Sequence, residues 1–501
     1  MRIVRYNARK SGVSVIDKQV LAAATGGFAV LCTSAVLAGP VYQPQGTNLT
    51  FGDVTHGKRV QSASSNPAGA AADHNRNAGK PFRGTVISFA GGLEYGNLQD
   101  LFDLYDEVTK GHEPTPPDIG PIQLPEPKPG IDFGVIWDAL DPDVQMAVTE
   151  IATEITIQAA LLAVISVEGH AKAWVAADAP FVIGNEFLGG AWTFGVNWSG
   201  SSKAYGLSEN IEFDSDEAVR RIEEWFAMLP INRPTILPVS DHVDLHVDPL
   251  TQVVTAFIDN DSSMITKSTQ TTDFGFGYSL KAWSNESGSL YLGAEAHYYN
   301  MQLSRVSIRF GDITDSEELF DAIRDADFRT DERLGVDLGA LWVGENYQLG
   351  VQVTNVNEPK FTFPDVDLDP YRNPQSILFL LLDQQYEMDR QWKLEGSWFS
   401  KDRRWSGHLG YDADSATDPM GDEFQWATFS VGYSTNSWWF PGARIGYRQN
   451  LAGTKLKYAA LGFTAFRYFN FDIASALDVV KIDGQKLPQG LMLSLGFEVS
   501  W

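Results

Sequence analysis

The chain has 501 residues, of which 44% are hydrophobic, 12% aromatic and 20% charged, and its formal net charge at pH 7 is −26. A surface this acidic repels nucleic acid, so we expect no nucleic-acid partner. Its 45 glycines and 14 tryptophans, with few long apolar runs, are typical of a transmembrane β-barrel and argue against a helical membrane protein.

The N-terminus has the features of an export signal. Basic residues between Arg2 and Lys18 precede a run of apolar or small residues from Val20 to Ala38. This pattern predicts a signal peptide at residues 1–38 that is cleaved after Ala38, and a retained membrane anchor is the less favoured alternative. Cys32 is the only cysteine, so cleavage would leave an exported chain without disulfides.

The next segment, residues 39–80, is polar, small and irregular. It lies directly before the first expected strand, Phe82–Tyr95, yet it is too polar to lie in lipid. Its small residues from Ser62 to Ala72 would let the backbone pack closely inside a lumen, and Pro67 would fix a turn there. We therefore expect residues 39–80 to plug a barrel formed by residues 81–501.

Helical and proline-rich segments interrupt the strand pattern, mainly in an insertion at about residues 98–179. The helix expected after Asp141 contains Glu150 and Glu154, so it is poorly suited to crossing a membrane. The expected elements are a short acidic helix at Leu98–Val108, a proline-rich connection at His112–Gly130, a helix at Asp141–Lys172 and a helix at Ser215–Leu229.

The last eleven residues, Leu491–Trp501, are apolar at every second position. A strand with this period has one apolar and one polar face, and its length fits the roughly 9–11 residues that a tilted strand needs to cross a bilayer. An aromatic final residue is typical of the strand that closes an outer-membrane barrel. This end of the chain therefore predicts a transmembrane barrel in the outer membrane.

The same alternation recurs from Val253 onward, with turns rich in Asn, Asp, Ser and Gly. It predicts roughly twelve to sixteen antiparallel strands, an even total. A soluble sandwich or propeller also alternates, but no repeat of about 40–50 residues supports a propeller. Clear alternation is found at 274–280, 290–299, 335–342, 348–354, 392–399, 405–411, 425–433, 443–449, 457–467 and 471–477.

Several motifs resemble one known superfamily. Ser65-Asn66-Pro67-Ala68, after a small-residue segment, is similar to the N-terminal hatch of FadL-type outer-membrane transporters of long-chain fatty acids. The rest is similar to the TraF-type conjugal-transfer outer-membrane family. The matching segments are Leu290–Tyr299, Arg333–Ala340, Gly350–Val356, Ala443–Asn450, Phe471–Ala474 and the last strand.

The resemblance covers about half of the chain. It implies an all-β fold, an antiparallel barrel of about fourteen strands, with a hatch that includes Asn66, Pro67 and Ala68 folded into the lumen. One departure is Thr55–Val60, which replaces the glycine-rich segment usual before the hatch motif. By analogy of fold, the resemblance implies passage or binding of small hydrophobic compounds. The alternative is a non-transporting envelope component of a conjugal-transfer or other assembly machine, with envelope proteins as partners.

Charged residues at polar positions of the strands are expected to face the lumen. The candidates are Glu295, His297, Asp337, Arg444 and Arg448. Since facing charges in a closed lumen need partners, we favour ion pairs that brace the barrel and hold the hatch. A polar path for a substrate is the alternative.

The sequence shows little chemistry, and we expect no enzyme, no metal and no cofactor. The alternation His242, Asp244, His246, Asp248 could hold a divalent ion, but a solvated strand face is favoured. The acidic turn Asp412–Glu423 could bind calcium, but loop solvation is favoured there too. His297 is the best placed base, yet no nucleophile is identifiable beside it. The expected surroundings are outer-membrane lipid and a small hydrophobic ligand.

Overall fold

The computed structural model describes residues 48–52, 54–55, 60, 64–76, 82–96, 170–184, 187–207, 220–221, 235–238, 243–248, 253–258, 261–309, 326–482 and 485–501. The expected signal peptide at 1–38 and the helix and proline-rich connection expected at 98–130 lie outside these residues. So do residues 141–169 of the next expected helix, and all but residues 220–221 of the helix expected at Ser215–Leu229.

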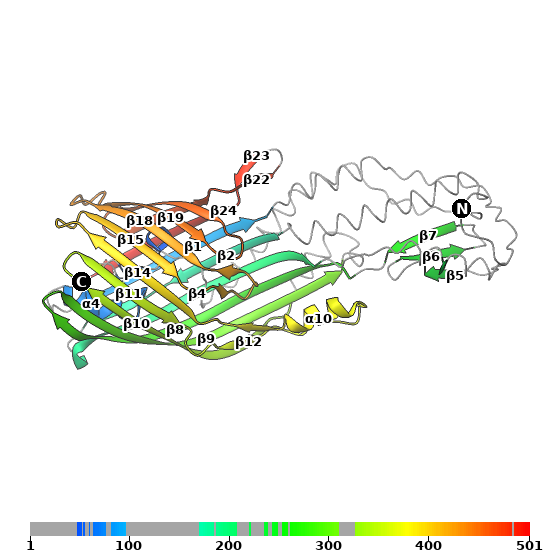
Figure 1. The fold of residues 1–501 in the computed structure, drawn as a ribbon, viewed down its shortest axis with the longest axis horizontal. Coiled ribbons are helices and arrows are strands. Elements are labelled where there is room, and N and C mark those ends of the chain that lie inside the picture. The colour runs from blue at the N-terminus through cyan, green and yellow to red at the C-terminus, as the bar shows by residue number, and fades with distance from the viewer. Residues whose placement is uncertain are drawn as a thin grey trace.

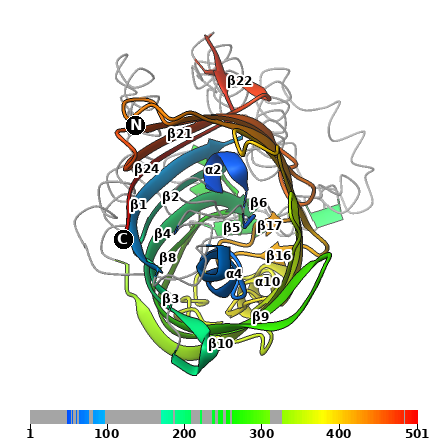
Figure 2. The same cartoon turned by 90° about the vertical axis from the view of Figure 1, so that its left-hand side faces the viewer.

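One large antiparallel sheet closes on itself to form a barrel (Figures 1 and 2). In spatial order its strands are β1 (Phe82–Tyr95), β24 (Gly490–Ser500), β21 (Phe469–Ala476), β20 (Lys457–Ala465), β19 (Gly442–Asn450), β18 (Trp426–Ser434), β15 (Trp405–Asp412), β14 (Gln391–Phe399), β11 (Tyr347–Thr354), β10 (Arg329–Val343), β9 (Gly288–Arg309), β8 (Ser263–Asn285), β4 (Gly190–Leu207), β2 (His170–Asp178) and β3 (Phe181–Gly184).

The fifteen segments form fourteen strands, because β2 and β3 together make one strand between β1 and β4. Asp178 pairs with Ser88 and Phe181 with Thr85, so the register continues unchanged across the break at Pro180. Closure leaves no edge strand among the described strands of the barrel, so no row of their backbone N–H and C=O groups faces lipid without a hydrogen-bond partner. The predicted all-β barrel is confirmed.

The two faces of the barrel strands differ as the alternation predicts. On β24, Leu493 and Leu495 are 52% and 53% exposed, whereas Met492 and Ser494 are buried. Neighbouring strands repeat this pattern, so a continuous apolar belt surrounds the barrel. Representative members of the belt are Ile87, Phe89, Phe276, Leu292, Leu338, Leu349, Leu394, Leu409, Phe429, Ile445, Leu461 and Ile473.

Exposed aromatic side chains border this belt at both ends of the strands, such as Trp398 and Trp405 at one end and Trp392 and Tyr411 at the other, as in membrane barrels. One end carries short turns, such as residues 286–287 and 344–346, and the other carries long connections, such as 208–262 and 355–390. Short turns are periplasmic and long loops extracellular in such barrels. The barrel therefore lies in the outer membrane, with both Phe82 and Trp501 near its periplasmic end. Among the described residues, no helix is long and apolar enough to cross a membrane.

Two short helices lie inside the barrel (Figure 2). Helix α2 (Asn48–Phe51) contacts β18 to β21, and helix α4 (Gly69–Arg76) contacts β3, β4, β8, β9 and β10. A third helix, α10 (Pro374–Leu382), lies at the extracellular end (Figure 1). None of these helices was predicted from the sequence.

Small elements complete the described chain. They are the 3₁₀ turn η1 (Phe187–Gly189) and four small sheets: β5 (Thr235–Pro238) with β6 (Val243–Asp248) and β7 (Val253–Ile258), β12 (Lys360–Thr362) with β13 (Gln385–Glu387), β16 (Ala416–Thr417) with β17 (Glu423–Phe424), and β22 (Val479–Ile482) with β23 (Gln485–Pro488).

The prediction that the helix beginning at Asp141 continues to Lys172 is wrong at its C-terminal end, because β2 begins at His170. The barrel therefore resumes at His170, before the residue near 179 where the insertion was expected to end.

Candidate functional site

The turn that leads into α4 rests directly on the barrel wall. Asn66 and Ala68 are buried, and Asn66 Oδ1 accepts a hydrogen bond from the Ala68 amide at 2.9 Å, which fixes the turn at Pro67. Gly293 and Gly339 lie beneath this turn. A Cβ atom at Gly293 would overlap the Pro67 carbonyl, and one at Gly339 would overlap the Asn66 side chain. Only glycine therefore lets the hatch approach the wall this closely.

A single carboxylate on β14 holds two parts of the hatch together. Glu395 accepts hydrogen bonds from Asn66 Nδ2 at 2.8 Å, from Thr55 Oγ1 at 3.1 Å and from the Thr55 amide. The Thr55 carbonyl in turn accepts from Ser397 Oγ at 3.1 Å and from Gln348 Nε2. Hydrogen bonds to an ionised carboxylate are stronger than neutral ones, so this cluster fixes the hatch to the wall.

An ion pair on β19 and β21 fastens α2 to another part of the wall. Arg444 on β19 and Asp472 on β21 lie 3.0 Å apart, with side chains 2% and 1% exposed. Thr50 of α2 donates a hydrogen bond to Asp472, and the Arg444 guanidinium lies 5.4 Å from the centre of the Phe51 ring. Because both charges are buried, each depends on the other for its stability.

Two further side chains of the barrel wall form hydrogen bonds with the backbone of the hatch. Arg448 lies 4.2 Å from the centre of the Trp426 ring and donates to the Leu49 carbonyl at 3.4 Å. Glu498 on the last strand accepts from the Val60 amide at 2.7 Å. The described residues between Asn48 and Arg76 are thus bound to strands around most of the barrel circumference.

The remaining lumen-facing candidates form a separate group on β8, β9 and β10. His297 Nδ1 lies 3.0 Å from Asp273, and its Nε2 lies 3.6 Å from Asp337. The imidazole stacks on the Tyr299 ring at 5.5 Å. The Glu295 carboxylate lies against the adjacent strand, where Gly275 leaves space for it. The structure brings Glu295, His297 and Asp337 together but places Arg444 and Arg448 elsewhere in the lumen.

The extracellular mouth is crossed by the connection 413–425, which we call the strap. Its Asp418 and Asp422 both pair with Lys172 on β2, the latter at 2.7 Å, and Asp422 also pairs with Lys203 on β4. The strap leaves the barrel between β15 and β18, and β15 lies seven strands from the β2/β3 strand in either direction around the ring. It therefore spans the full width of the mouth.

Lys172 and Lys203 of the barrel wall balance the negative charges of Asp418 and Asp422 in the strap. Burial alone would raise the pKa of Asp422, but the positive charges of Lys172 and Lys203 outweigh burial and lower it. Asp422 is therefore held in its ionised form, which keeps its ion pairs with Lys172 and Lys203 intact. The acidic turn Asp412–Glu423 is interpreted from the sequence as a solvated or calcium-binding loop. In the structure, ion pairs hold its Asp418 and Asp422 against the barrel wall.

No group of three or more His, Cys, Asp or Glu among the described residues is arranged to hold a metal ion. The backbone of β6 confirms a strand over 243–248, while His242 and the side chains of this strand lie outside what the structure describes.

The sequence matches a family model described as "F plasmid transfer operon, TraF, protein" over residues 63–414, or 352 of the 501 residues. The chain belongs to this family. The resemblance expected from the sequence is thereby confirmed. No curated protein matches the chain.

Several solved barrels are similar to this chain. A FadL homologue from Pseudomonas aeruginosa is 11% identical and covers 93% of this chain and 99% of its own, with a TM-score of 0.34. The toluene transporter TodX from P. putida is 9% identical, with 93% and 98% covered and a TM-score of 0.37. The toluene transporter TbuX from Ralstonia pickettii is 8% identical, with 91% and 98% covered and a TM-score of 0.30.

Sequence reasoning missed some residues of the site. Glu395 lies within the alternating residues 392–399, but nothing in the sequence showed that its carboxylate binds Asn66 and Thr55. Gly293 and Gly339 each lie in a motif that resembles the family, although the motif does not reveal that the two glycines meet. Lys172 was assigned to a helix, so its pairing with the strap was not visible.

Proposed function

We propose that this outer-membrane barrel binds small hydrophobic compounds at its extracellular mouth and passes them inward. The observation that carries the proposal is the apolar surface of α10. Leu378, Phe379, Leu381 and Leu382 are 54%, 39%, 43% and 74% exposed. A cluster of exposed apolar side chains on one short helix marks an interaction site.

Helix α10 lies above the lipid-facing belt. It packs beside Lys267 and Arg305, which are register partners on β8 and β9 where these strands extend beyond the first residue of β10. The outward residues of β8 change there from apolar Phe274 to polar Thr272 and Gln270. Lipid therefore does not account for the exposed side chains of α10.

The helix is held firmly while its apolar side chains remain exposed. The Asn373 side chain caps its first turn, and Arg305 Nη1 donates to the Leu380 carbonyl at 2.9 Å. Asp383, just after the helix, pairs with Lys267 at 2.6 Å. Leu380 itself is fully buried beside Ile265 and Tyr371. A fixed apolar surface at the mouth suits the capture of a small apolar molecule because little ordering is needed on binding.

Binding of toluene to the purified protein tests the proposal. The double variant Leu378→Ser/Leu382→Ser should weaken binding. The control Leu477→Ser replaces another exposed leucine, 55% exposed, near the same end of the barrel and should leave binding unchanged. Equal toluene binding by all three proteins, measured by saturation-transfer NMR, would remove the support for this function.

A non-transporting envelope component is the second candidate function. The observation that favours it is that the lumen is crossed twice, by the hatch and by the strap. The family name, from a plasmid transfer operon, suggests an envelope assembly as the setting. Single-channel conductance with and without residues 39–80 separates the two candidates. A truncated barrel that folds yet conducts no more than the intact protein would favour the non-transporting role.

A further inference from the structure

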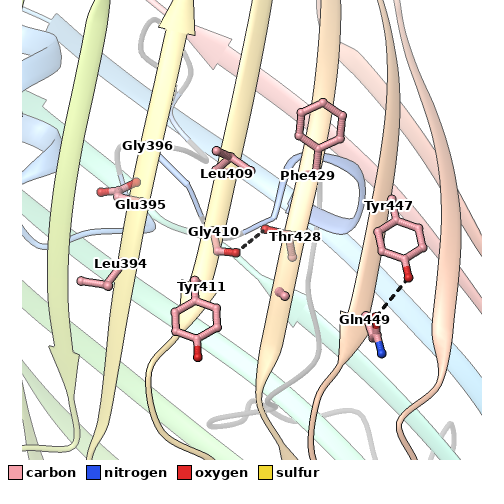
Figure 3. Close-up of a pocket in the computed structure, with 11 residues that line it drawn as sticks. Leu394, Glu395, Gly396, Leu409, Gly410, Tyr411, Thr428, Phe429, Tyr447 and Gln449 are labelled. Atoms are coloured by element: carbon pink, nitrogen blue, oxygen red, sulfur yellow. Dashed lines mark hydrogen bonds between the residues drawn. The ribbon is translucent and has the colours of Figure 1, made fainter.

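A groove of about 500 Å³ lies on the lipid-facing side of the wall, over β14, β15, β18 and β19 (Figure 3). Leu394, Leu409 and Phe429 line it, and they are 47%, 60% and 51% exposed as members of the apolar belt. The groove is therefore continuous with the surface that meets the bilayer. It lies apart from the strap and from α10, and its lining includes Glu395, whose carboxylate binds the hatch on the lumenal side.

Small residues account for the depression in the wall. Gly396 lies two residues from Leu394 on the same outward face of β14, and Ala427 lies two residues from Phe429 on the outward face of β18. The larger side chains around these two positions project into the bilayer, whereas Gly396 and Ala427 project at most a methyl group. The result is an apolar channel along the wall instead of a smooth surface.

The outward-facing polar side chains of the groove gather at one end, whereas Glu395 and Thr428, which also line it, come from the lumenal face of the wall. Tyr411, Tyr447 and Gln449 lie near the extracellular ends of their strands, and the Tyr447 hydroxyl donates to Gln449 Oε1 at 3.1 Å. Figure 3 shows their polar atoms toward the same end, while Gly396, Leu409 and Phe429 lie toward the other. A membrane lipid has this same polarity in the outer leaflet, with its headgroup toward the cell exterior and its chain toward the mid-plane.

We propose that the groove is a binding site for one acyl chain of an outer-leaflet lipid, whose polar headgroup region meets Tyr411, Tyr447 and Gln449. The lining is apolar where the chain would lie, and hydrogen-bonding groups are placed where the ester or amide linkage would lie. Filling the groove removes both the chain and the apolar lining from contacts with mobile lipid. This site is independent of hydrocarbon capture at the mouth.

The test is photolabelling of the full-length protein in phosphatidylethanolamine vesicles that contain a trace of phosphatidylethanolamine with a diazirine on one acyl chain. Labelled peptides are mapped by mass spectrometry. We expect label on β14, β15, β18 and β19 to exceed label on the lipid-facing residues of β8 to β10 several-fold. Even labelling around the belt would overturn the proposal.

Two matched pairs of variants sharpen the test. A Cβ at Gly396 would meet only Leu349 Cδ2 at 3.6 Å, and one at the lipid-facing Gly407 would meet only a backbone oxygen at 4.0 Å. Gly396→Val should therefore fold and reduce groove labelling several-fold, whereas Gly407→Val should not reduce it. Ala427→Leu and the outward control Ala296→Leu form the second pair. Unchanged groove labelling in both filled variants would overturn the proposal.

Competition identifies the occupant. Excess unlabelled phosphatidylethanolamine should displace the label from the groove, whereas toluene should not. Displacement by toluene would assign the groove to the transport path and overturn the lipid assignment. The double variant Leu378→Ser/Leu382→Ser should label as the unmodified protein does, so the mouth proposal and the groove proposal can fail separately.

Discussion

Gly293 of β9 and Gly339 of β10 are direct register partners, and the Asn66-Pro67 turn of the hatch lies on both of them. Two paired glycines remove every side chain from one spot of the inner wall. The hatch backbone can then contact the strand backbones directly, and Glu395 on β14 binds the Asn66 amide beside this spot. The position of the Asn66-Pro67 turn is thus set by missing side chains as much as by hydrogen bonds.

The glycine pair gives the first prediction. Gly339→Val should displace the hatch, because the new side chain occupies the space of the Asn66 side chain. We expect single-channel conductance to rise and the free energy of unfolding to fall by about 1–3 kcal/mol, as for other overpacked sites. Gly195→Val is the control, since its Cβ would meet no atom closer than 3.9 Å. Equal conductance in both variants would show that the turn does not position the plug.

The last strand gives the second prediction. Leu495 is 53% exposed on the lipid side, whereas Gly496 faces inward, where a Cβ would make only ordinary contacts at 3.7 Å. Leu495→Arg should destabilise the barrel by about 2–4 kcal/mol if it lies near the bilayer mid-plane. Gly496→Ser should have a much smaller effect. Urea unfolding in lipid vesicles measures both, and equal losses would contradict the assignment of faces.

The buried ion pair gives the third prediction. Arg444→Met leaves Asp472 buried without its cation, so it should cost about 3–5 kcal/mol of barrel stability. The double variant Arg444→Met/Asp472→Asn should lose less than the sum of the two single variants, because neither charge is then left alone. A double-mutant cycle from urea unfolding gives the coupling, and strict additivity would show that the pair does not act as a unit.

The strap gives the fourth prediction. Asp422→Asn removes the carboxylate that Lys172 and Lys203 share, so amide hydrogen exchange across residues 413–425 should become faster. Asp414→Asn, in the same connection, is the control. Faster exchange in the control alone, or in neither variant, would show that these ion pairs do not hold the strap.

The pH dependence of the strap follows from the same residue. The ordinary pKa of the Asp422 carboxyl is 3.8, and Lys172 and Lys203 lower it despite burial. A lowered pKa means that folding favours the ionised form, so this stabilisation is fully present above about pH 4 and is lost as the pH falls below it. The part of the strap's protection from exchange that Asp422 supplies should therefore persist from about pH 8 to pH 4, once the measured rates are corrected for the intrinsic pH dependence of amide exchange. Opening near neutral pH would contradict this assignment.

The sequence by itself determined the barrel and its faces. Strand alternation depends only on the period of two, so Phe82–Tyr95 was placed with the bounds that the structure shows, and the apolar face of Leu491–Phe497 was correctly assigned. The inward positions of Arg444 and Arg448 follow from the same alternation. These features are local, and one strand is enough to infer them.

Only the tertiary structure decided which residues meet across the lumen. The pairing of Asp418 and Asp422 with Lys172 joins residues about 250 positions apart, and Glu395 reaches Asn66 over 329 positions. Such contacts depend on the number of strands, on their register and on barrel closure, none of which a single strand encodes. Helix α10 was missed because its nine residues, PQSILFLLL, have no polar face from which a helical period could be read. Its place at the mouth is fixed by Lys267 and Arg305, which only the folded barrel brings beside it.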